Sequence, residues 1–467
     1  MYNRLRYSCS RFSKERSKGR AKNPSKERAH FEIERLILAL KLSTGRIVAS
    51  TIISALWIAI ASPVLAQQVD PVIRADFLEN PLTSENRDPL LPALSVDREY
   101  SPLERQMIAR DLDQLAQAAQ QLLEAGQISE AFALWRRELK LRRVLGPQQE
   151  FAAIQRVTSI AWNRQRITDV QLLTLRTREI WDTIQASLGV ASTDAKAPDE
   201  ASSDAPEESL VSGAPTADLA TLNELAQTFV TLRDIDSSVE VYQQLIALSP
   251  EEDGTKQLQQ LTLAALHLEW FHFAEATNLY LTLLNQAKAQ GDIAQERVYL
   301  EQLAYSYQQA DALLNANRAQ TDLLELYRAM GEEEKFPEVM VAIAQNYRQL
   351  NLHTSAIDYY RAAYREAQRF EQFSFSAQVL NDLGSLYESL ALTEDALGTY
   401  SLLIPVEQQA YNDYGIMNAH DKIGQLQRRQ GNDLEALKAF ERALVIADRL
   451  SLREAYFIEQ IEAVSQR

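Results

Sequence analysis

The sequence has 467 residues, 46% of them hydrophobic, and a formal net charge of −16. Only 14 glycines and 14 prolines, together with abundant Ala, Leu, Gln and Glu, indicate a mostly helical chain. The acidic balance argues against a nucleic-acid partner, because binding phosphates requires a dense cationic surface. The single cysteine, Cys9, leaves the rest of the chain without disulfides, thiol nucleophiles or thiolate metal sites.

Residues 1–66 are predicted to be a basic leader followed by a signal peptide. Residues 1–46 hold 13 basic and four acidic residues, and the uncharged run from Ile47 to Ala66 follows them. Pro63 and the small residues ending at Ala66 are typical of a cleavage site. A run of this length also spans a bilayer, so an uncleaved inner-membrane anchor at residues 47–66 is the alternative. We therefore expect an exported protein in the periplasm or another extracytoplasmic compartment.

Residues 67–217 contain three further segments. Five prolines and no helical period predict an extended or turn-rich segment over 67–103. A helical pattern over 104–188, which includes LLEAGQISEAFALWRREL, predicts degenerate helix pairs. Residues 189–217 are rich in Ser, Ala, Pro and acidic residues, so we expect a disordered linker.

One pattern recurs at a constant spacing of 40 between residues 264 and 424. Small residues at 264, 304, 344, 384 and 424 are each followed 12 positions later by alanine, and four positions after that usually by an aromatic residue such as Tyr400 or Phe440. Gln320 replaces the aromatic in one repeat. The pattern resembles the tetratricopeptide repeat and extends over residues 219–458. The resemblance implies an all-α, right-handed superhelical solenoid of helix pairs, A and B, with about six repeats and a C-terminal capping helix.

The small residues are expected where helix A crosses helix B, because a larger side chain would hold the two backbones apart.

The segment HLEWFH, residues 267–272, raises the question of a metal site. His267 and His272 would diverge by roughly 140° on a continuous helix, which is a poor arrangement for metal ligands. In the repeat frame they fall at the end of a helix A and in the following turn, so we expect a structural role.

No enzymatic site is expected. The phosphate-binding patterns GxxxxGK[ST] and GxGxxG and the nucleophile pattern GxSxG are absent. His420 beside Asp421 is interpreted as a half-exposed pair on the inner wall of the solenoid. We therefore expect neither a cofactor nor a resident metal ion.

The resemblance implies that the A helices line a concave face that binds peptides or protein segments. Amide side chains are frequent on this face, and they can both donate to and accept from a peptide backbone. No lysine occurs there, so the carboxylate clamp of chaperone-binding family members is missing. Carried over position by position, the face consists of Asn223, Gln227, Glu301, Tyr305, Gln308, Gln345, Arg348, Asn381, Glu388, Asn418, Asp421, Gln425 and Arg428.

A second surface is suggested by charge. Residues 130–186 carry 10 basic and six acidic residues, whereas 187–467 carry 20 and 43. Arg136, Lys140 and Arg143 share one side of a predicted helix. The alternatives for this surface are an acidic partner, anionic lipid headgroups, the chain's own acidic linker, or solvent alone.

The expected function is a non-enzymatic scaffold or assembly factor of the cell envelope that binds a protein or peptide. The alternatives are a metal-carrying or a membrane-tethered assembly factor.

Overall fold

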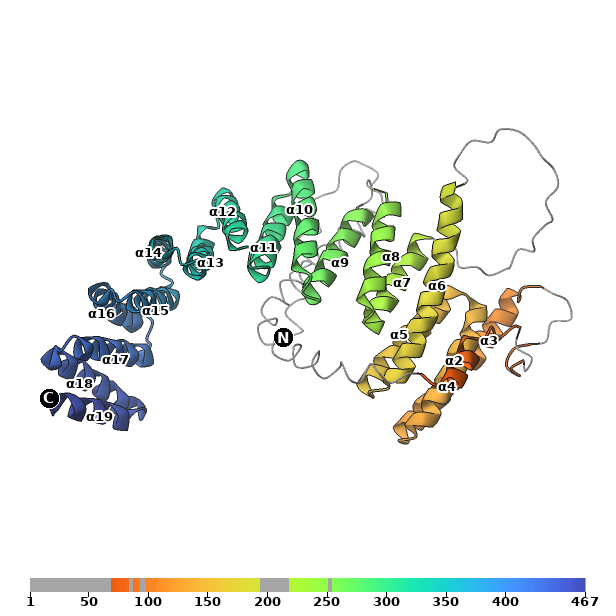
Figure 1. Ribbon diagram of the computed structural model, residues 1–467, viewed down its shortest axis with the longest axis horizontal. Coiled ribbons are helices and arrows are strands. Elements are labelled where there is room, and N and C mark those ends of the chain that lie inside the picture. The colour runs from red at the N-terminus through yellow and green to blue at the C-terminus, as the bar shows by residue number, and fades with distance from the viewer. Residues whose placement is uncertain (1–68, 84–86, 93–97, 194–217, 251–253, 467) are drawn as a thin grey trace, which may run out of the picture. The chain divides into compact units, whose positions relative to one another are not determined.

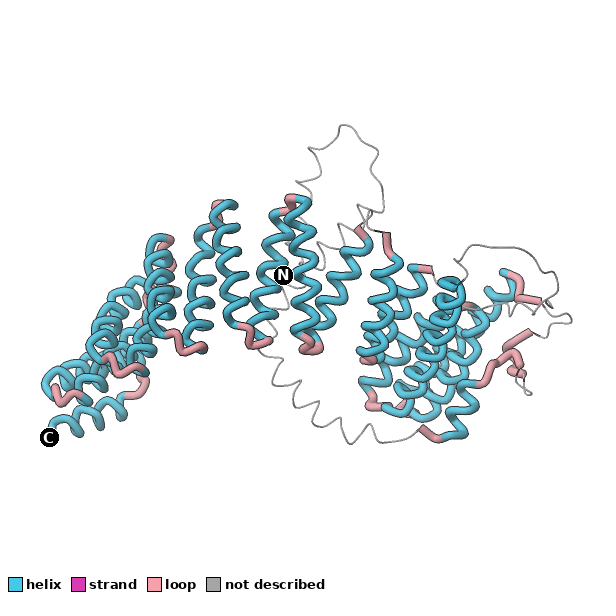
Figure 2. The backbone as a smooth tube through the Cα atoms, turned by 45° about the horizontal axis from the view of Figure 1, so that its top comes forward, coloured by secondary structure: helices cyan, strands magenta, loops and turns pink. Residues whose placement is uncertain are grey.

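The computed structural model describes residues 69–83, 87–92, 98–193, 218–250 and 254–466, and every regular element in these ranges is a helix (Figures 1 and 2). The predicted leader, the apolar run at 47–66 and most of the predicted linker lie outside the described residues. None of the helices within them is both long and apolar enough to cross a membrane.

The chain divides into two compact units between Leu263 and Ala264, inside helix α9 (Thr255–Glu269). The helices of unit 1 are α2 (Pro71–Leu78), α3 (Pro102–Glu124), α4 (Ile128–Arg142), α5 (Pro147–Asn163), α6 (Ile167–Thr193), α7 (Leu219–Leu232) and α8 (Ile235–Leu248), with a 3₁₀ turn at Arg143–Leu145. The helices of unit 2 are α10 (Phe273–Gln290), α11 (Ile293–Gln309), α12 (Leu313–Met330), α13 (Phe336–Gln349), α14 (His353–Arg369), α15 (Phe373–Ser389), α16 (Thr393–Gln409), α17 (Asp413–Arg429), α18 (Asp433–Leu450) and α19 (Glu454–Ser465), with a 3₁₀ turn at Glu333–Lys335.

The segment before α3 is more ordered than the sequence predicts. Helix α2 lies within the predicted extended segment, because Pro71 occupies its first turn, where a missing N–H costs nothing, and Asp70 caps it by accepting a hydrogen bond from Val72 N at 2.8 Å. The extended prediction is therefore wrong for Pro71–Leu78. Helix α6 also continues to Thr193, five residues into the predicted linker.

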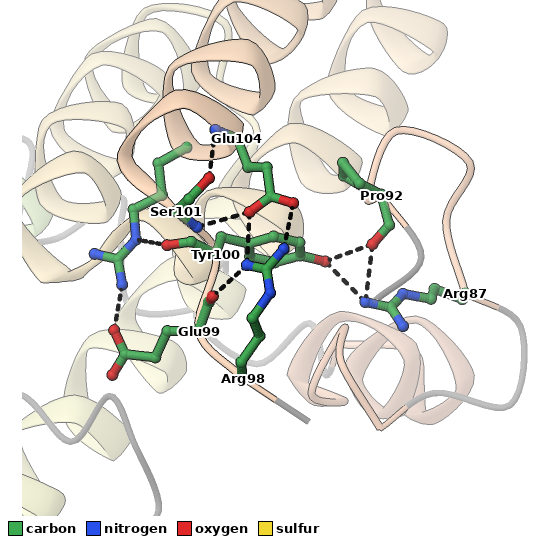
Figure 3. A network of polar contacts seen from close by, with 8 residues as sticks. Arg87, Pro92, Arg98, Glu99, Tyr100, Ser101 and Glu104 are labelled. Atoms are coloured by element: carbon green, nitrogen blue, oxygen red, sulfur yellow. Dashed lines mark hydrogen bonds and ion pairs between the residues drawn. The ribbon is translucent and has the colours of Figure 1, made fainter. Parts of the chain in front are cut away.

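A polar network fastens this segment to the start of α3 (Figure 3). The Arg87 guanidinium donates to the Tyr100 hydroxyl at 2.8 Å, and that hydroxyl donates to the Pro92 carbonyl at 3.1 Å. Ser101 and Glu104 form a reciprocal capping box at the start of α3. Tyr100 itself is buried with Leu91 against α3, so the hydrogen bonds hold an apolar contact in place.

Small residues lie at the helix crossings of unit 2, as predicted. A side chain added at Gly384 of α15 would place its Cβ 2.7 Å from the Tyr400 ring of α16, and one added at Gly424 of α17 would lie 2.6 Å from the Phe440 ring of α18. Both rings are fully buried. The aromatic ring therefore occupies the space that the glycine leaves.

Gln320 lies at the position where the other repeats carry an aromatic ring, and it is buried in an amide network. Asn346 of α13 donates to the side-chain oxygens of both Gln320 at 3.0 Å and Asn317 at 2.8 Å. Gln308 of α11 donates in turn to Asn346 at 3.0 Å. Buried amides require such partners, so three helices are joined where an aromatic contact is lost.

Left-handed residues end the helices of unit 2 at regular intervals. Positive φ angles occur at 271, 291, 311, 331, 351, 371, 391, 411, 431 and 451. The next N–H along the chain bonds back to the carbonyl five residues before it, as in Asn412 N to Glu407 O at 2.9 Å. This is the Schellman arrangement, which satisfies the last carbonyls of a helix. Each helix together with its turn therefore takes up the same length of chain.

Candidate binding face

The predicted groove residues of unit 2 lie on one side of alternate helices. In α11 they are Glu301, Tyr305 and Gln308, spaced four and three residues apart, which places them on one side of the helix. The equivalent positions of the following repeats fall on α13, α15 and α17. We call this side of α11, α13, α15 and α17 the A face.

The middle of the A face is open. Gln345 of α13 and Asn381 of α15 are both exposed. Arg348 of α13 is half-buried beside the Tyr360 hydroxyl and the Asp382 carboxyl. Burial raises the pKa of Asp382, while the nearby Arg348 opposes that shift. The open polar groups are thus two amides and a partly accessible guanidinium.

Three other predicted residues, on α11, already have partners in the chain or are partly covered. Glu301 accepts a hydrogen bond from the Tyr327 hydroxyl at 3.0 Å and another from Arg297 at 3.3 Å. Gln308 belongs to the amide network described above. Tyr305 is half-buried, and burial raises the pKa of its hydroxyl.

Glu388 of α15 is fully engaged within unit 2. Its carboxylate accepts from Tyr400 at 2.6 Å, Arg429 at 2.8 Å and Lys422 at 3.1 Å. Burial acts to raise the pKa of Glu388, but these three donors outweigh it and hold the pKa below its ordinary value. Glu388 therefore links α15 to α16 and α17, and a partner would have to displace these donors to bind it.

The four predicted residues of α17 lie against the chain's own last helix. Asp421 is buried and accepts from two groups of this C-terminal segment, Arg453 at 2.6 Å and Tyr456 at 2.9 Å. The remaining contacts of the set are Arg453 to Asn418 at 3.0 Å, Gln425 to the Tyr456 hydroxyl at 3.1 Å and Arg428 to Gln460 at 2.7 Å. The expectation that this part of the face is open is therefore corrected: α19 and the residue before it engage all four side chains, although Asn418 also lines a cleft shared with α15 and α16.

In unit 1 the predicted residues lie on α7. Asn223 is half-buried and Gln227 is exposed. Helix α7 is held against α5 by Gln155, which donates to the Thr228 hydroxyl at 2.9 Å, and by the Trp162 indole, which donates to the Thr231 carbonyl at 3.1 Å. Gln227 is the open amide of this pair.

The basic side of α4 is covered by the chain itself. Lys140 pairs with Asp76 at 3.0 Å and with Glu79 at 2.9 Å, both from the α2 region. Arg136 pairs with Asp169 at 2.6 Å. Arg143 donates to backbone carbonyls at the end of α2, and burial lowers its pKa to about 10. Of the predicted basic surface, Lys140 and Arg143 therefore bind the segment that precedes α3, and Arg136 binds α6.

His267 and His272 come together, contrary to the geometry expected of a continuous helix. Helix α9 ends at Glu269, and Phe271 takes a left-handed conformation, so the chain turns back. The two Nδ1 atoms lie 3.4 Å apart. Within the described residues, no group of three His, Cys, Asp or Glu side chains is placed to hold a metal ion.

His420 and Asp421 are both buried, so the half-exposed pair that the sequence suggests is not formed. The Asp421 carboxylate is engaged by Arg453, Tyr456 and Gln425. Burial and the positive charge of Arg442 lower the pKa of His420. The pair belongs to the packing between α17 and its neighbours.

A family model described as tetratricopeptide repeat matches residues 219–252 and 337–369. The two segments contain the helix pairs α7–α8 and α13–α14. The chain carries tetratricopeptide repeats. The second matched segment falls within the 40-residue pattern of unit 2, and the helix pairs before and after it follow the same pattern. No curated protein matches the chain.

Several solved structures are similar to parts of the chain. BtubC (BKLC) from P. vanneervenii is 22% identical over 47% of this chain and 90% of its own, with a TM-score of 0.33. The apo form of RapI is 14% identical over 53% and 71%, with a TM-score of 0.37. The apo quorum sensor NprR from B. thuringiensis is 17% identical over 53% and 70%, with a TM-score of 0.32. At these low scores the likenesses carry no argument about function.

Two features of the A face are not predicted from the sequence. The first is its coverage by α19, which depends on how the last helix packs. The second is Glu407 of α16, which lies buried in a cleft lined also by α15 and α17. Its signal was present in the repeat frame, because Ala287, Ala367 and Ala447 occupy the equivalent position of other repeats.

Proposed function

We propose that the protein is a non-enzymatic interaction scaffold or assembly factor that binds a protein segment along the A face of unit 2. The observation that carries this proposal is the pair of exposed amides, Gln345 and Asn381, on the consecutive A helices α13 and α15. An extended segment crossing these helices meets one open amide on each. An amide can donate to and accept from the backbone of such a segment whatever its side chains.

The fold supports this proposal at a coarser level. Tetratricopeptide repeats form scaffolds for protein–protein interaction, and stacked helix pairs present extended surfaces rather than enclosed active sites. The open part of the face is narrower than the sequence predicts, because Glu388 is internally paired and α19 covers α17. Arg348 is the one cation among the predicted residues on the two helices that carry the open amides, so it is the residue to test.

The binding test uses residues 67–467 as bait in envelope and soluble exported fractions of the source cell. We expect a specific protein to be retained by the native chain and at least tenfold less by Arg348→Glu. The control is Arg365→Glu, the same charge reversal at an exposed position of α14, which is a B helix. Equal retention by all three proteins would remove the A face as the binding surface. Arg428 is not used, because its contact with Gln460 holds α19.

We also propose that the scaffold acts outside the cytoplasm. The support is the basic leader and the uncharged run from Ile47 to Ala66. Mass spectrometry of the protein isolated from its source should find a mature N-terminus at Gln67. An intact chain that fractionates with the inner membrane would instead make it a membrane-tethered scaffold.

A further inference from the structure

A cleft of about 260 Å³ opens between α15, α16 and α17 in unit 2. Two predicted groove residues, Asn381 and Asn418, line it together with Gln378 and Tyr414. Glu407 of α16 contributes to the lining although only 8% of its surface is exposed. The cleft therefore continues the A face inward to a buried carboxyl group. Among the described residues that line it there is no lysine or arginine.

The Glu407 carboxyl is held in place by the turn after α16. The Asn412 side chain donates to Glu407 Oε2 at 2.8 Å and accepts from Gly415 N at 3.1 Å. The Asn412 backbone N–H also bonds to the Glu407 carbonyl at 2.9 Å. A Cβ at Gly415 would overlap the carboxyl carbon, so only glycine leaves room for the carboxyl there. The group is fixed before any ligand arrives.

Glu407 differs from other buried carboxylates of the described residues. Glu138, Glu150, Asp169 and Asp421 are even more deeply buried, and each forms an ion pair with arginine at 2.6 to 2.7 Å. For Glu407 the described residues supply a neutral amide and no cation. A buried charge without a counter-charge is costly, and burial raises the pKa of Glu407 accordingly.

Packing does not require a carboxylate at this position. Three of the other B helices in unit 2 carry alanine there, namely Ala287, Ala367 and Ala447, and all three are buried. A methyl group packs the end of the B helix in those three repeats, whereas Glu407 also extends into the space beside Gly415. The carboxylate adds a cost to folding that these repeats avoid, and a bound ligand with a positive charge would offset this cost.

We propose that this cleft binds a lysine or arginine side chain of the partner protein, with Glu407 as its counter-charge. The proposal rests on the proposed function of the A face and names the chemistry that this face selects. Tyr414, which is half exposed, can cover the aliphatic stem of such a side chain or stack on its cationic group. The excess of acidic over basic residues in 187–467 attracts a basic partner to the same region.

The test uses degenerate synthetic dodecapeptides whose central residue is fixed as lysine, arginine or norleucine, the last being a neutral analogue of the lysine stem. Binding to the purified full chain is followed by fluorescence anisotropy. We expect the lysine or the arginine mixture to bind at least tenfold more tightly than the norleucine mixture. Glu407→Gln should abolish this preference, whereas Asp358→Asn, which removes an exposed carboxylate of α14, should leave it unchanged.

Thermal unfolding of the same variants separates recognition from folding. Glu407→Gln removes an unpaired buried charge, so its Tm should equal or exceed that of the native chain. A Tm lowered by several degrees would assign Glu407 to the fold and overturn the proposal.

Equal binding of basic and neutral mixtures, or no binding of any mixture, would also overturn the proposal. In either case, retention of a partner that depends on Arg348 would leave the scaffold function standing. Loss of both results would remove the scaffold function as well.

Discussion

At Gly384 the backbone of α15 lies directly against a side chain of α16, because the Tyr400 ring occupies the space where a Cβ would be. Gly398 of α16 is also helical, but nothing lies within 4 Å of the position of its Cβ. The two glycines therefore have opposite effects on the stability of the chain. One makes a helix crossing possible, and the other only weakens a helix.

Alanine substitutions should separate these two cases. Gly384→Ala forces the buried Tyr400 ring to move, and overpacking of about 1–3 kcal/mol outweighs a gain in helix propensity of about 1 kcal/mol. Gly398→Ala should instead stabilise the chain by about 0.5–1 kcal/mol. Thermal unfolding followed by circular dichroism measures both. A gain in Tm for Gly384→Ala would contradict the crossing.

His267 should make the stability of the chain depend on pH. Burial and the neighbouring His272 lower its pKa in the folded state. The unfolded chain then binds the proton more tightly, so this contribution is intact above the ordinary pKa of about 6.5. It is lost as the pH falls below that value through the lowered folded pKa.

Replacing His267 with Gln should reduce the loss of unfolding free energy between pH 7 and pH 5. The measurement is denaturant unfolding of native and variant chains at both pH values. The comparison is made as a difference between the two chains, because buried acids such as Glu407 titrate with the opposite sign. Identical losses in the two chains would show that His267 does not titrate differently on folding.

At the scale of elements, unit 2 is a series of helices that end in left-handed residues at a constant period. Glycine adopts this conformation without strain, as at Gly431. A residue with a Cβ, such as Ala391 or Tyr411, adopts it at a cost of about 1 kcal/mol. The sequence accepts this cost at several turns, because the Schellman hydrogen bonds require a left-handed residue there whatever its side chain.

Exchanging alanine and glycine at two of these turns should shift stability in opposite directions. Ala391→Gly should raise the unfolding free energy by up to about 1 kcal/mol, since it relieves the left-handed strain. Gly431→Ala should lower it by about the same amount. Chemical denaturation measures both, and a destabilised Ala391→Gly chain would contradict this account of the turn.

The last helix, α19, both completes the core and limits the A face. Phe457 is fully buried against Phe440, Ala443 and Ala447 of α18. Polar groups of the same segment bind Asp421 and Arg428 of α17. The open surface that a partner can use on the A face therefore ends at α17.

For the whole molecule, stability is a sum of local contacts, because each helix pair packs mainly on its neighbours. Phe132 of α4 and Phe440 of α18 are both fully buried, but they belong to different compact units. Nearest-neighbour packing confines the energy lost at each residue mainly to the helices beside it. The two units are therefore expected to open independently.

Truncating each aromatic should show this independence. Phe132→Ala and Phe440→Ala should each cost about 3–5 kcal/mol locally. Hydrogen exchange followed by mass spectrometry should show faster exchange in α3–α6 for the first variant and in α16–α19 for the second. Accelerated exchange throughout the chain in either variant would indicate that the two units unfold together.

The repeat frame could be predicted from the sequence because it depends on contacts close in the chain. Gly384 and Tyr400 lie on consecutive helices, and the pairing of a small residue with a large one reveals that they touch. The face that carries Gln345 and Asn381 follows from the same repeat frame. The prolines of 67–103 predict no helix because proline interrupts a helix at most positions, whereas Pro71 lies in the first turn of α2, where proline is favoured.

By itself, the sequence determined the all-α class, the repeat and the residues at the helix crossings, because these are set by periodic patterns over one or two helices. Only the tertiary structure decided which polar groups stay open. Arg136 and Lys140 are paired with acids distant in the chain, and Asp421 is closed by α19. Counter-charges for buried groups are drawn from anywhere within reach in space, so spacing along the chain does not reveal them. The repeat frame singles out the position of Glu407, but its lack of a cation is evident only once its surroundings are known.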